Sequence, residues 1–253
     1  MNSQEKYALV FGGGGSRGAF EVGVLNAIRE LNIPIGLIVG SSIGSLNATF
    51  AVQGADLADL YNRITLQNII PDENLNSEKD IFEFENLMQT VKGVIKNKGY
   101  STENLHSLIE EYIDFEKIYE SEIDLGIVTC STPFTPLVAF KNGIPKEQLI
   151  DYIIASCCFP IFKRQTIDGK KYIDGGFWDN VPVNVAISRG YTKIIAVDLS
   201  SVGFRKPTKK VEGLEITIIK APKKSIGGLF EMNSEQINFN IKLGYETAMN
   251  IFK

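Results

Sequence analysis

The fold is decided by the stretch YALVFGGGGSRGAFEVGVLNAIRELNIPIGLIV, which spans residues 7–39. Two short apolar runs, Tyr7–Phe11 and Ile35–Val39, each predict a buried strand. Between them, apolar or small residues recur at helical spacing and predict one buried helix face: Phe20, Gly23, Val24, Ala27, Ile28 and Leu31. Two strands joined by a helix of this length form a parallel, right-handed βαβ unit. The stretch therefore predicts the start of an α/β fold.

The same alternation continues along the 253 residues. No linker, repeat or low-complexity tract divides the chain, which predicts one three-layer α/β/α domain over residues 1–253 with a mostly parallel central sheet. Further strands are expected at Ile123–Cys130, Leu137–Phe140, Lys193–Leu199 and Leu214–Ile219, with a hairpin at Ile167–Ile173. Further helices are expected at Ile43–Gln53, Lys146–Ser156, Val183–Arg189 and Ser234–Phe252.

The segment from Asn68 to Thr102 differs from the rest of the chain. It begins polar and turn-rich, and then Ile81, Phe84, Met88, Val91 and Ile95 fall on one face of a helix. That spacing is the ordinary signature of a core-packed amphipathic helix. The alternative is a cap at about residues 68–102 that covers a site and contacts lipid.

Composition excludes several classes of protein. The net charge of −4 argues against a nucleic-acid binder, which is normally basic. The start, MNSQEKYALV, has no cationic region followed by an apolar stretch, so no signal peptide is expected. The longest nearly apolar run, Tyr152–Phe162, is too short to span a bilayer. Cys130, Cys157 and Cys158 lack metal-ligand spacing and indicate reduced thiols. We expect a cytoplasmic protein with at most peripheral membrane contact and with no required metal or cofactor.

Gly40-Ser41-Ser42-Ile43-Gly44 matches the G-x-S-x-G pattern at a strand-to-helix turn. Such a turn strains its middle residue, and the glycines two residues to either side allow close backbone approach. The strained turn would lift the Ser42 hydroxyl above the carboxyl edge of the sheet, where the helix dipole favours an oxyanion. The alternative is a tight glycine turn in which Ser42 only caps the helix.

The glycine-rich stretch Gly12–Gly18 contains a formal G-x-G-x-x-G pattern, which occurs in dinucleotide-binding folds. That function needs an acid near the end of the second strand, and residues 32–54 contain no Asp or Glu. The stretch also lacks the Gly-Lys-Ser/Thr end of a P-loop. The remaining interpretation is a series of backbone N–H groups at a helix N-terminus, an arrangement that can stabilise negative charge.

A Ser-His-Asp triad needs a histidine, and the chain has only His106, in a predicted helix outside these motifs. Among the acids, Asp174 ends a short strand and precedes Gly175-Gly176, whose small size lets a ligand or backbone approach. Asp198, at the end of another strand, is the second candidate. Asp168 fits a hairpin turn better.

Four motifs together resemble the patatin-like phospholipases: GGGGSRGAFEVGVL (12–25), GSSIGS (40–45), ASCCFPIF (155–162) and DGG (174–176). The resemblance covers roughly residues 7–200. It implies a patatin α/β/α fold, lipid acyl hydrolase activity and a Ser-Asp dyad without histidine. By position, Ser42 is the nucleophile, Asp174 its base, and the amides of Gly13, Gly14 and Gly15 the oxyanion hole. Arg17 either steadies the loop or contacts a phosphate, while Gly40, Gly44, Gly175 and Gly176 shape the elbow and the acid loop.

Three alternatives to a phospholipid hydrolase stay open. One is a carboxylesterase or thioesterase acting on soluble acyl groups, and another is an acyltransferase in which an alcohol replaces water. The third is an inactive lipid-binding protein, against which the intact Ser42, Asp174 and glycine loop count.

A basic region follows late in the chain. Residues 201–225 carry seven cations against two acids, a local charge of +5. Because they follow two predicted strands, we expect them to crowd the carboxyl edge near Ser42 and to contact anionic lipid. The alternative is a pair of solvated loops. The cations are Arg205, Lys206, Lys209, Lys210, Lys220, Lys223 and Lys224.

Overall fold

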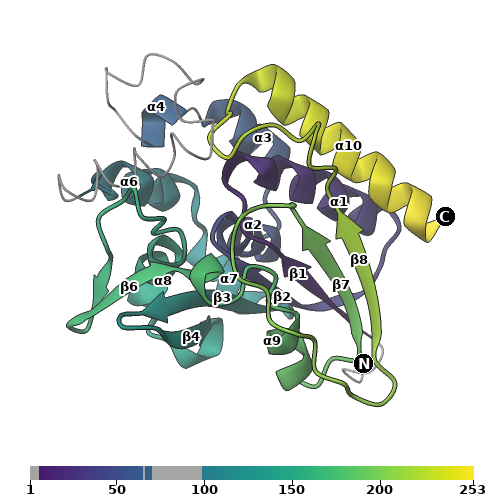
Figure 1. Cartoon of the computed structure of the whole chain (residues 1–253), viewed down its shortest axis with the longest axis horizontal. Coiled ribbons are helices and arrows are strands. Elements are labelled where there is room, and N and C mark those ends of the chain that lie inside the picture. The colour runs from purple at the N-terminus through teal and green to yellow at the C-terminus, as the bar shows by residue number, and fades with distance from the viewer. Residues whose placement is uncertain (1–5, 65, 70–98) are drawn as a thin grey trace.

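A computed structural model of the chain describes residues 6–64, 66–69 and 99–253. Its centre is an eight-stranded sheet in the order β5-β6-β3-β2-β1-β7-β8, with β4 paired to β3 (Figure 1). Five strands run parallel: β1 (Tyr7–Phe11), β2 (Ile35–Ser41), β3 (Asp124–Ser131), β7 (Lys193–Asp198) and β8 (Glu215–Lys220). Three are antiparallel: β4 (Thr135–Phe140), β5 (Thr166–Ile167) and β6 (Lys170–Asp174). The predicted mostly parallel α/β fold is confirmed.

Side chains alternate between the two faces of the sheet, as the period of a strand requires. In β1, Leu9 and Phe11 join the larger apolar cluster, whereas Ala8 and Val10 join the smaller one. The larger cluster is covered by α1 (Ala19–Glu30), α2 (Ile43–Val52), α8 (Leu149–Ser156) and α10 (Ser234–Phe252). The smaller cluster is covered by α9 (Val183–Ser188). Helices on both faces give the three layers that the sequence predicts.

Helices α1 and α10 lie against each other along much of their length (Figure 1). A Cβ atom at Gly23 would collide with the carbonyl oxygen of Ile241, and one at Gly244 with that of Phe20. These two glycines therefore let the backbones of the helices approach closely. The crossing fixes α10, and with it the residues just before α10, relative to the N-terminal βαβ unit.

The other helices of the described residues connect the strands. They are α3 (Leu57–Arg63), α4 (Leu66–Ile69), α6 (Glu103–Tyr112) and α7 (Phe115–Glu120), with 3-10 turns η1 (Gly15–Gly18), η2 (Lys141–Gly143), η3 (Lys146–Gln148) and η4 (Gly175–Phe177). The helix expected at Lys146–Ser156 divides into η3 and α8. Most of the expected cap, residues 70–98, lies outside the described residues. None of the described helices combines the length and apolarity needed to cross a bilayer.

The loop between β7 and β8 corrects the expectation that all seven late cations crowd the carboxyl edge. Phe204 stays at that edge, because its amide donates to Gly176 O (2.9 Å) and its carbonyl accepts the Asn180 amide (2.6 Å). The loop then crosses α9, where Asn184 Nδ2 donates to Pro207 O (2.9 Å) and Lys209 N donates to Asn184 Oδ1 (2.8 Å). It reaches the opposite edge before β8 (Figure 1). Arg205 still lies at the carboxyl edge, where it pairs with Asp198 at the end of β7 (2.7 Å), and Lys220, Lys223 and Lys224 follow β8 at that edge, whereas Lys209 and Lys210 do not lie there.

Candidate active site

The register of β3 brings the predicted nucleophile and acid together. One edge of β3 pairs with β4 from Gly126 to Ser131. The other edge pairs with β2 as far as Ser41 opposite Val128, and then with β6, where Asp174 lies opposite Thr129. Two strands thus share one edge of β3 end to end. Ser42, the residue after β2, meets Asp174, the last residue of β6, although they are 132 positions apart in the chain.

Ser42 has the strained backbone that the elbow pattern predicts. Its φ of 55° and ψ of −130° lie in a region that residues other than glycine rarely adopt. A Cβ atom at Gly40 would collide with the carbonyl of Gly44, and one at Gly44 would lie 2.6 Å from Phe11 O. The two flanking glycines are therefore required by close backbone approach.

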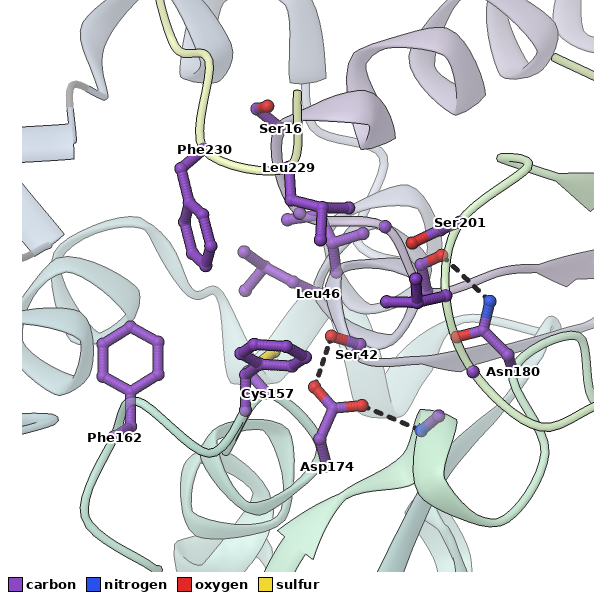
Figure 2. A pocket seen from close by; sticks show the side chains of 18 of the residues that line it. Ser16, Ser42, Leu46, Cys157, Phe162, Asp174, Asn180, Ser201, Leu229 and Phe230 are labelled. Atoms are coloured by element: carbon purple, nitrogen blue, oxygen red, sulfur yellow. Dashed lines mark hydrogen bonds between the residues drawn. The ribbon is translucent and has the colours of Figure 1, made fainter. Parts of the chain in front are cut away.

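The Ser42 hydroxyl donates a hydrogen bond to Asp174 Oδ2 at 2.6 Å (Figure 2). The other carboxylate oxygen, Oδ1, accepts the Gly176 amide at 2.8 Å. Asp174 is buried, and burial raises its pKa from 3.8 to about 6, against the opposing effect of these two hydrogen bonds. A carboxylate with a raised pKa is a stronger base than an ordinary aspartate, so the pair can transfer a proton from the hydroxyl.

Two further serines hold the backbone of Ser42, and one of them, Ser156, was not predicted from the sequence. Ser156, at the end of α8, accepts the Ser42 amide (2.9 Å) and donates to Val128 O (2.6 Å). Ser45, one turn into α2, donates its hydroxyl to Ser42 O (2.7 Å). The strained turn is thereby fixed on both sides.

The glycine-rich loop lies beside Ser42, but its three candidate amides differ. The Gly13 amide donates to Asn180 O (2.9 Å), and Asn180 Nδ2 donates back to Gly13 O (3.1 Å). Within the described residues, the amides of Gly14 and Gly15 have no hydrogen-bond acceptor. The prediction that the Gly13 amide belongs to the oxyanion hole is therefore wrong, because this N–H already donates to Asn180 O. Gly13 instead attaches the loop to Asn180. Gly14 and Gly15 remain the candidate donors.

Arg17 steadies the loop. Its Nε donates to Gly227 O (2.9 Å) and its NH1 group to Ser200 O (3.1 Å). The half-buried guanidinium thus joins the glycine loop to two later segments of the chain. It does not line the cavity described below, so of the two functions considered for Arg17 the geometry favours the structural one.

A buried polar cluster lies behind the glycine loop. Glu21 of α1 is fully buried, and its Oε2 accepts Asn47 Nδ2 of α2 at 2.8 Å. Asn47 also accepts the Tyr61 hydroxyl of α3 (3.1 Å) and donates to Gly18 O (3.1 Å). Burial raises the pKa of Glu21 well above its ordinary value, while hydrogen bonds from Asn47 and the Gly12 amide oppose the shift. The cluster ties three helices to the end of the loop.

A cavity of about 570 Å³ opens onto Ser42 and Asp174. Its walls are largely aliphatic and aromatic, and no Lys or Arg of the described residues contributes to them. A volume in this range suits a small-molecule or acyl-chain ligand. The lining comprises Gly13–Ser16, Ser42, Ile43, Leu46, Tyr61, Ile69, Leu105, Cys157, Phe159, Pro160, Phe162, Asp174, Gly176, Phe177, Asn180, Ser201–Phe204, Leu229, Phe230 and Met232.

The other candidate residues lie outside this cavity. Asp198 accepts hydrogen bonds from Arg205 NH2 (2.7 Å) and the Ser200 amide (2.8 Å), which is a structural use of its carboxylate. Asp168 occupies the hairpin turn with a φ of 49°. His106 pairs with Glu110 on α6 at 3.4 Å. In the part of the chain that the structure describes, no three His, Cys, Asp or Glu side chains form a group that could hold a metal ion.

Known proteins are similar to this chain in sequence and in fold. The family model described as patatin-like phospholipase matches residues 9–187. The chain is similar to lysophospholipase NTE1 of Kluyveromyces lactis, with 30% identity over 217 residues, or 81% of this chain. It is also similar to patatin-like phospholipase domain-containing protein 7 of Rattus norvegicus, with 28% identity over 77% of this chain. The chain spans only 13% and 14% of the lengths of these two relatives.

The fold also resembles that of VipD from Legionella pneumophila. The TM-score is 0.55 with 14% identity, over 98% of this chain and 66% of the other. At this identity the likeness concerns the fold alone. The family match ends at residue 187, before the segments at Ser201–Phe204 and Leu229–Met232 that complete the cavity.

Proposed function

The chain belongs to the patatin-like phospholipase family, and from this premise we propose that it hydrolyses carboxylic esters of lipids through a Ser42–Asp174 dyad. The observation that carries the proposal is the 2.6 Å hydrogen bond from the Ser42 hydroxyl to Asp174 at an apolar cavity. The relatives named as lysophospholipases support a phospholipid or lysophospholipid as the substrate.

The first half of the reaction forms an acyl-enzyme. Ser42 Oγ attacks the ester carbonyl while its proton passes to Asp174 Oδ2, and the carbonyl oxygen becomes an oxyanion. The Gly14 and Gly15 amides, with the N-terminus of α2, stabilise that charge. The tetrahedral intermediate then expels the alcohol, which takes the proton from Asp174.

The second half releases the acid. Asp174 accepts a proton from water as the water oxygen attacks the acyl-Ser42 carbonyl, and the same amides hold the new oxyanion. Collapse breaks the bond to Ser42 Oγ, which regains the proton from Asp174, and a carboxylic acid leaves. Because the Asp174 pKa is about 6, the base is ionised above that pH and the reaction needs no histidine.

Labelling with a fluorophosphonate tests the nucleophile. We expect the wild-type chain to be labelled at Ser42 and the Ser42→Ala variant to be unlabelled and inactive toward esters. The matched control is Ser41→Ala, since Ser41 is buried and its hydroxyl has no hydrogen-bond partner among the described residues. Loss of labelling in Ser41→Ala, with labelling kept in Ser42→Ala, would reject the assignment.

Product analysis separates the competing functions. Incubation with a diacyl phospholipid, a lysophospholipid and a soluble thioester, each with and without a long-chain alcohol, distinguishes hydrolysis from acyl transfer. We expect free fatty acid from the lipids as the main product. A folded protein that is labelled but releases product only from the soluble thioester would favour the alternative of a carboxylesterase or thioesterase acting on soluble acyl groups. A protein that binds lipid vesicles but is never labelled would favour an inactive lipid-binding protein.

Contact with an anionic membrane is part of the same proposal. Lys220, Lys223 and Lys224 are exposed and follow β8 at the carboxyl edge, where the cavity lies. A lysine near an anionic surface contributes about 1 kcal/mol to binding. These three cations would attract the lipid surface that holds the substrate.

A further inference from the structure

The segment just before α10 forms a strap, residues 226–232, across the glycine-rich loop. Three consecutive backbone carbonyls of the strap accept hydrogen bonds from that loop. Arg17 Nε donates to Gly227 O (2.9 Å), Ser16 Oγ to Gly228 O (2.9 Å) and the Ser16 amide to Leu229 O (2.8 Å). The strap is therefore fastened to the backbone that carries the candidate oxyanion amides.

The strap is also fixed at its two ends. Asn240 of α10 donates to Ile226 O (3.0 Å), and Ile226 itself is fully buried. At the other end, the Glu231 carboxylate accepts the Gly228 amide (2.9 Å) and Asn233 Nδ2 (3.3 Å). Asn233 then caps α10 through the Gln236 amide (2.8 Å). With its polar groups occupied in this way, the strap presents a fixed apolar surface.

That surface is one wall of the cavity. Leu229, Phe230 and Met232 all line it. The Phe230 ring meets the edge of Phe159 at a centroid distance of 6.2 Å, so it closes against the opposite wall. Figure 2 shows Leu46 between Ser42 and Phe230, and Phe162 on the same side of the cavity. The side chains of Leu46, Phe162, Leu229 and Phe230 make this side of Ser42 largely apolar.

The other side of Ser42 has a different character. Asn180 and Ser201 lie there, each with a polar group, and the neighbouring Val202 and Phe204 are 46% and 65% exposed. A lipid ester has an apolar acyl chain on one side of its carbonyl and a polar alcohol on the other. The acyl chain therefore fits the side of the strap, and the leaving alcohol fits the side of Asn180.

We propose that the strap, and Phe230 above all, sets the length of the acyl chain that the cavity accepts. This inference rests on the proposed ester hydrolysis and adds a specificity determinant from a part of the chain that the family match does not cover. Each methylene buried is worth about 0.8 kcal/mol, or about fourfold in kcat/KM, until the chain meets the wall. Removing the Phe230 ring should let the cavity accept longer acyl chains, and enlarging the ring should restrict it to shorter ones.

The test compares p-nitrophenyl butyrate, octanoate, dodecanoate and palmitate, dispersed in one neutral detergent. In Phe230→Ala we expect the ratio of kcat/KM for palmitate to that for butyrate to rise about tenfold. In Phe230→Trp the same ratio should fall. Phe239→Ala is the matched control, because Phe239 lies on α10 outside the cavity and is 45% exposed.

The outcomes separate the two proposals. If the wild-type chain hydrolyses none of these esters, the proposed function fails. If it hydrolyses them and both Phe230 variants keep the wild-type ratio, the inference about the strap is overturned. A decrease in kcat/KM by the same factor for every acyl-chain length would also overturn it. That result is expected if the substitution only displaces the glycine-rich loop. Labelling by short-chain and long-chain alkyl fluorophosphonates provides a second readout that does not depend on turnover.

Discussion

The cavity is built by two regions of the chain that are constrained in different ways. Up to residue 187, the chain contributes a strained serine and glycines that tolerate no Cβ, together with apolar side chains such as Leu46, Phe159 and Phe162. After β7, side chains of the 201–204 loop and of the strap line the cavity. Their backbones form hydrogen bonds that hold these segments in place. In the proposed reaction, the strained turn and the glycines of the first region hold the reacting atoms. The second region completes the walls of the cavity around them.

This difference predicts two kinds of mutational effect. Substitutions of the dyad and of the glycines in the first region should lower the rate for every ester alike, because each ester passes through the same oxyanion. Substitutions in the second region should change the ranking of esters or lipid surfaces. The predictions below run from the largest expected effect to the smallest.

Asp174→Asn should reduce kcat/KM at least about 10³-fold for all esters, since it removes the proton acceptor of Ser42. In the wild-type chain, kcat/KM should fall as the pH drops below about 6, where Asp174 becomes protonated. A pH–rate profile and steady-state kinetics with short and long esters measure both. Unequal losses across chain lengths would break the proposed division between the regions.

The same substitution should stabilise the fold at neutral pH. Because the Asp174 pKa is raised from 3.8 to about 6 in the folded chain, protonated Asp174 favours the folded state. This contribution to stability is fully present below pH 3.8 and is lost as the pH rises through about 6. At 1.36 kcal/mol per pKa unit, Asp174→Asn would recover about 2–3 kcal/mol at pH 7. Thermal unfolding at pH 4 and pH 7 measures this, and a variant less stable than wild type at pH 7 would contradict it.

Charge reversal in the second region should weaken binding to anionic vesicles without lowering hydrolysis of a soluble ester. We expect Lys220→Glu, Lys223→Glu and Lys224→Glu together to reduce vesicle binding about 10–100-fold at low salt. Lys209→Glu with Lys210→Glu is the control, because these residues follow the loop over α9. Equal losses in both variants, measured by co-sedimentation, would show a nonspecific charge effect.

Asn180→Ala should lower kcat about fivefold with little change in KM, because a hydrogen bond worth about 1 kcal/mol holds Gly13 and hence the neighbouring amides. Asn184→Ala is the matched control, since Asn184 bonds only to the exposed loop over α9. A larger KM with unchanged kcat in Asn180→Ala would instead indicate a direct contact with the leaving alcohol.

His106→Ala should change kcat/KM less than about twofold, since a surface substitution outside the site rarely has a large effect. Its imidazole pairs with Glu110 on α6 and does not line the cavity. A folded His106→Ala protein with activity lowered a thousandfold would restore a triad and remove the dyad.

Short-range patterns explain which parts the sequence predicted. The βαβ unit, the strained turn at Ser42 and the hairpin before Asp174 all depend on residues within one strand, helix or turn. Ser156 and the strap could not be predicted, because their contacts join distant positions. The bond from Ser42 to Ser156 spans 114 residues, and that from Ser16 to Gly228 spans 212. The course of the 199–214 loop was predicted wrongly because strand ends indicate where a loop starts and not how it returns.

The attachment of the strap to α10 also bears on how the protein is made. A ribosome delivers the chain from its N-terminus, and domains can begin to fold as they emerge. Residues 7–174 contain both Ser42 and Asp174, yet Phe230 and the helix that fixes it to α1 emerge later. A nascent chain would thus hold a paired serine and aspartate before it holds a closed acyl pocket. The acyl pocket would therefore close only once Gly244 has left the ribosome and α10 packs against Gly23 of α1.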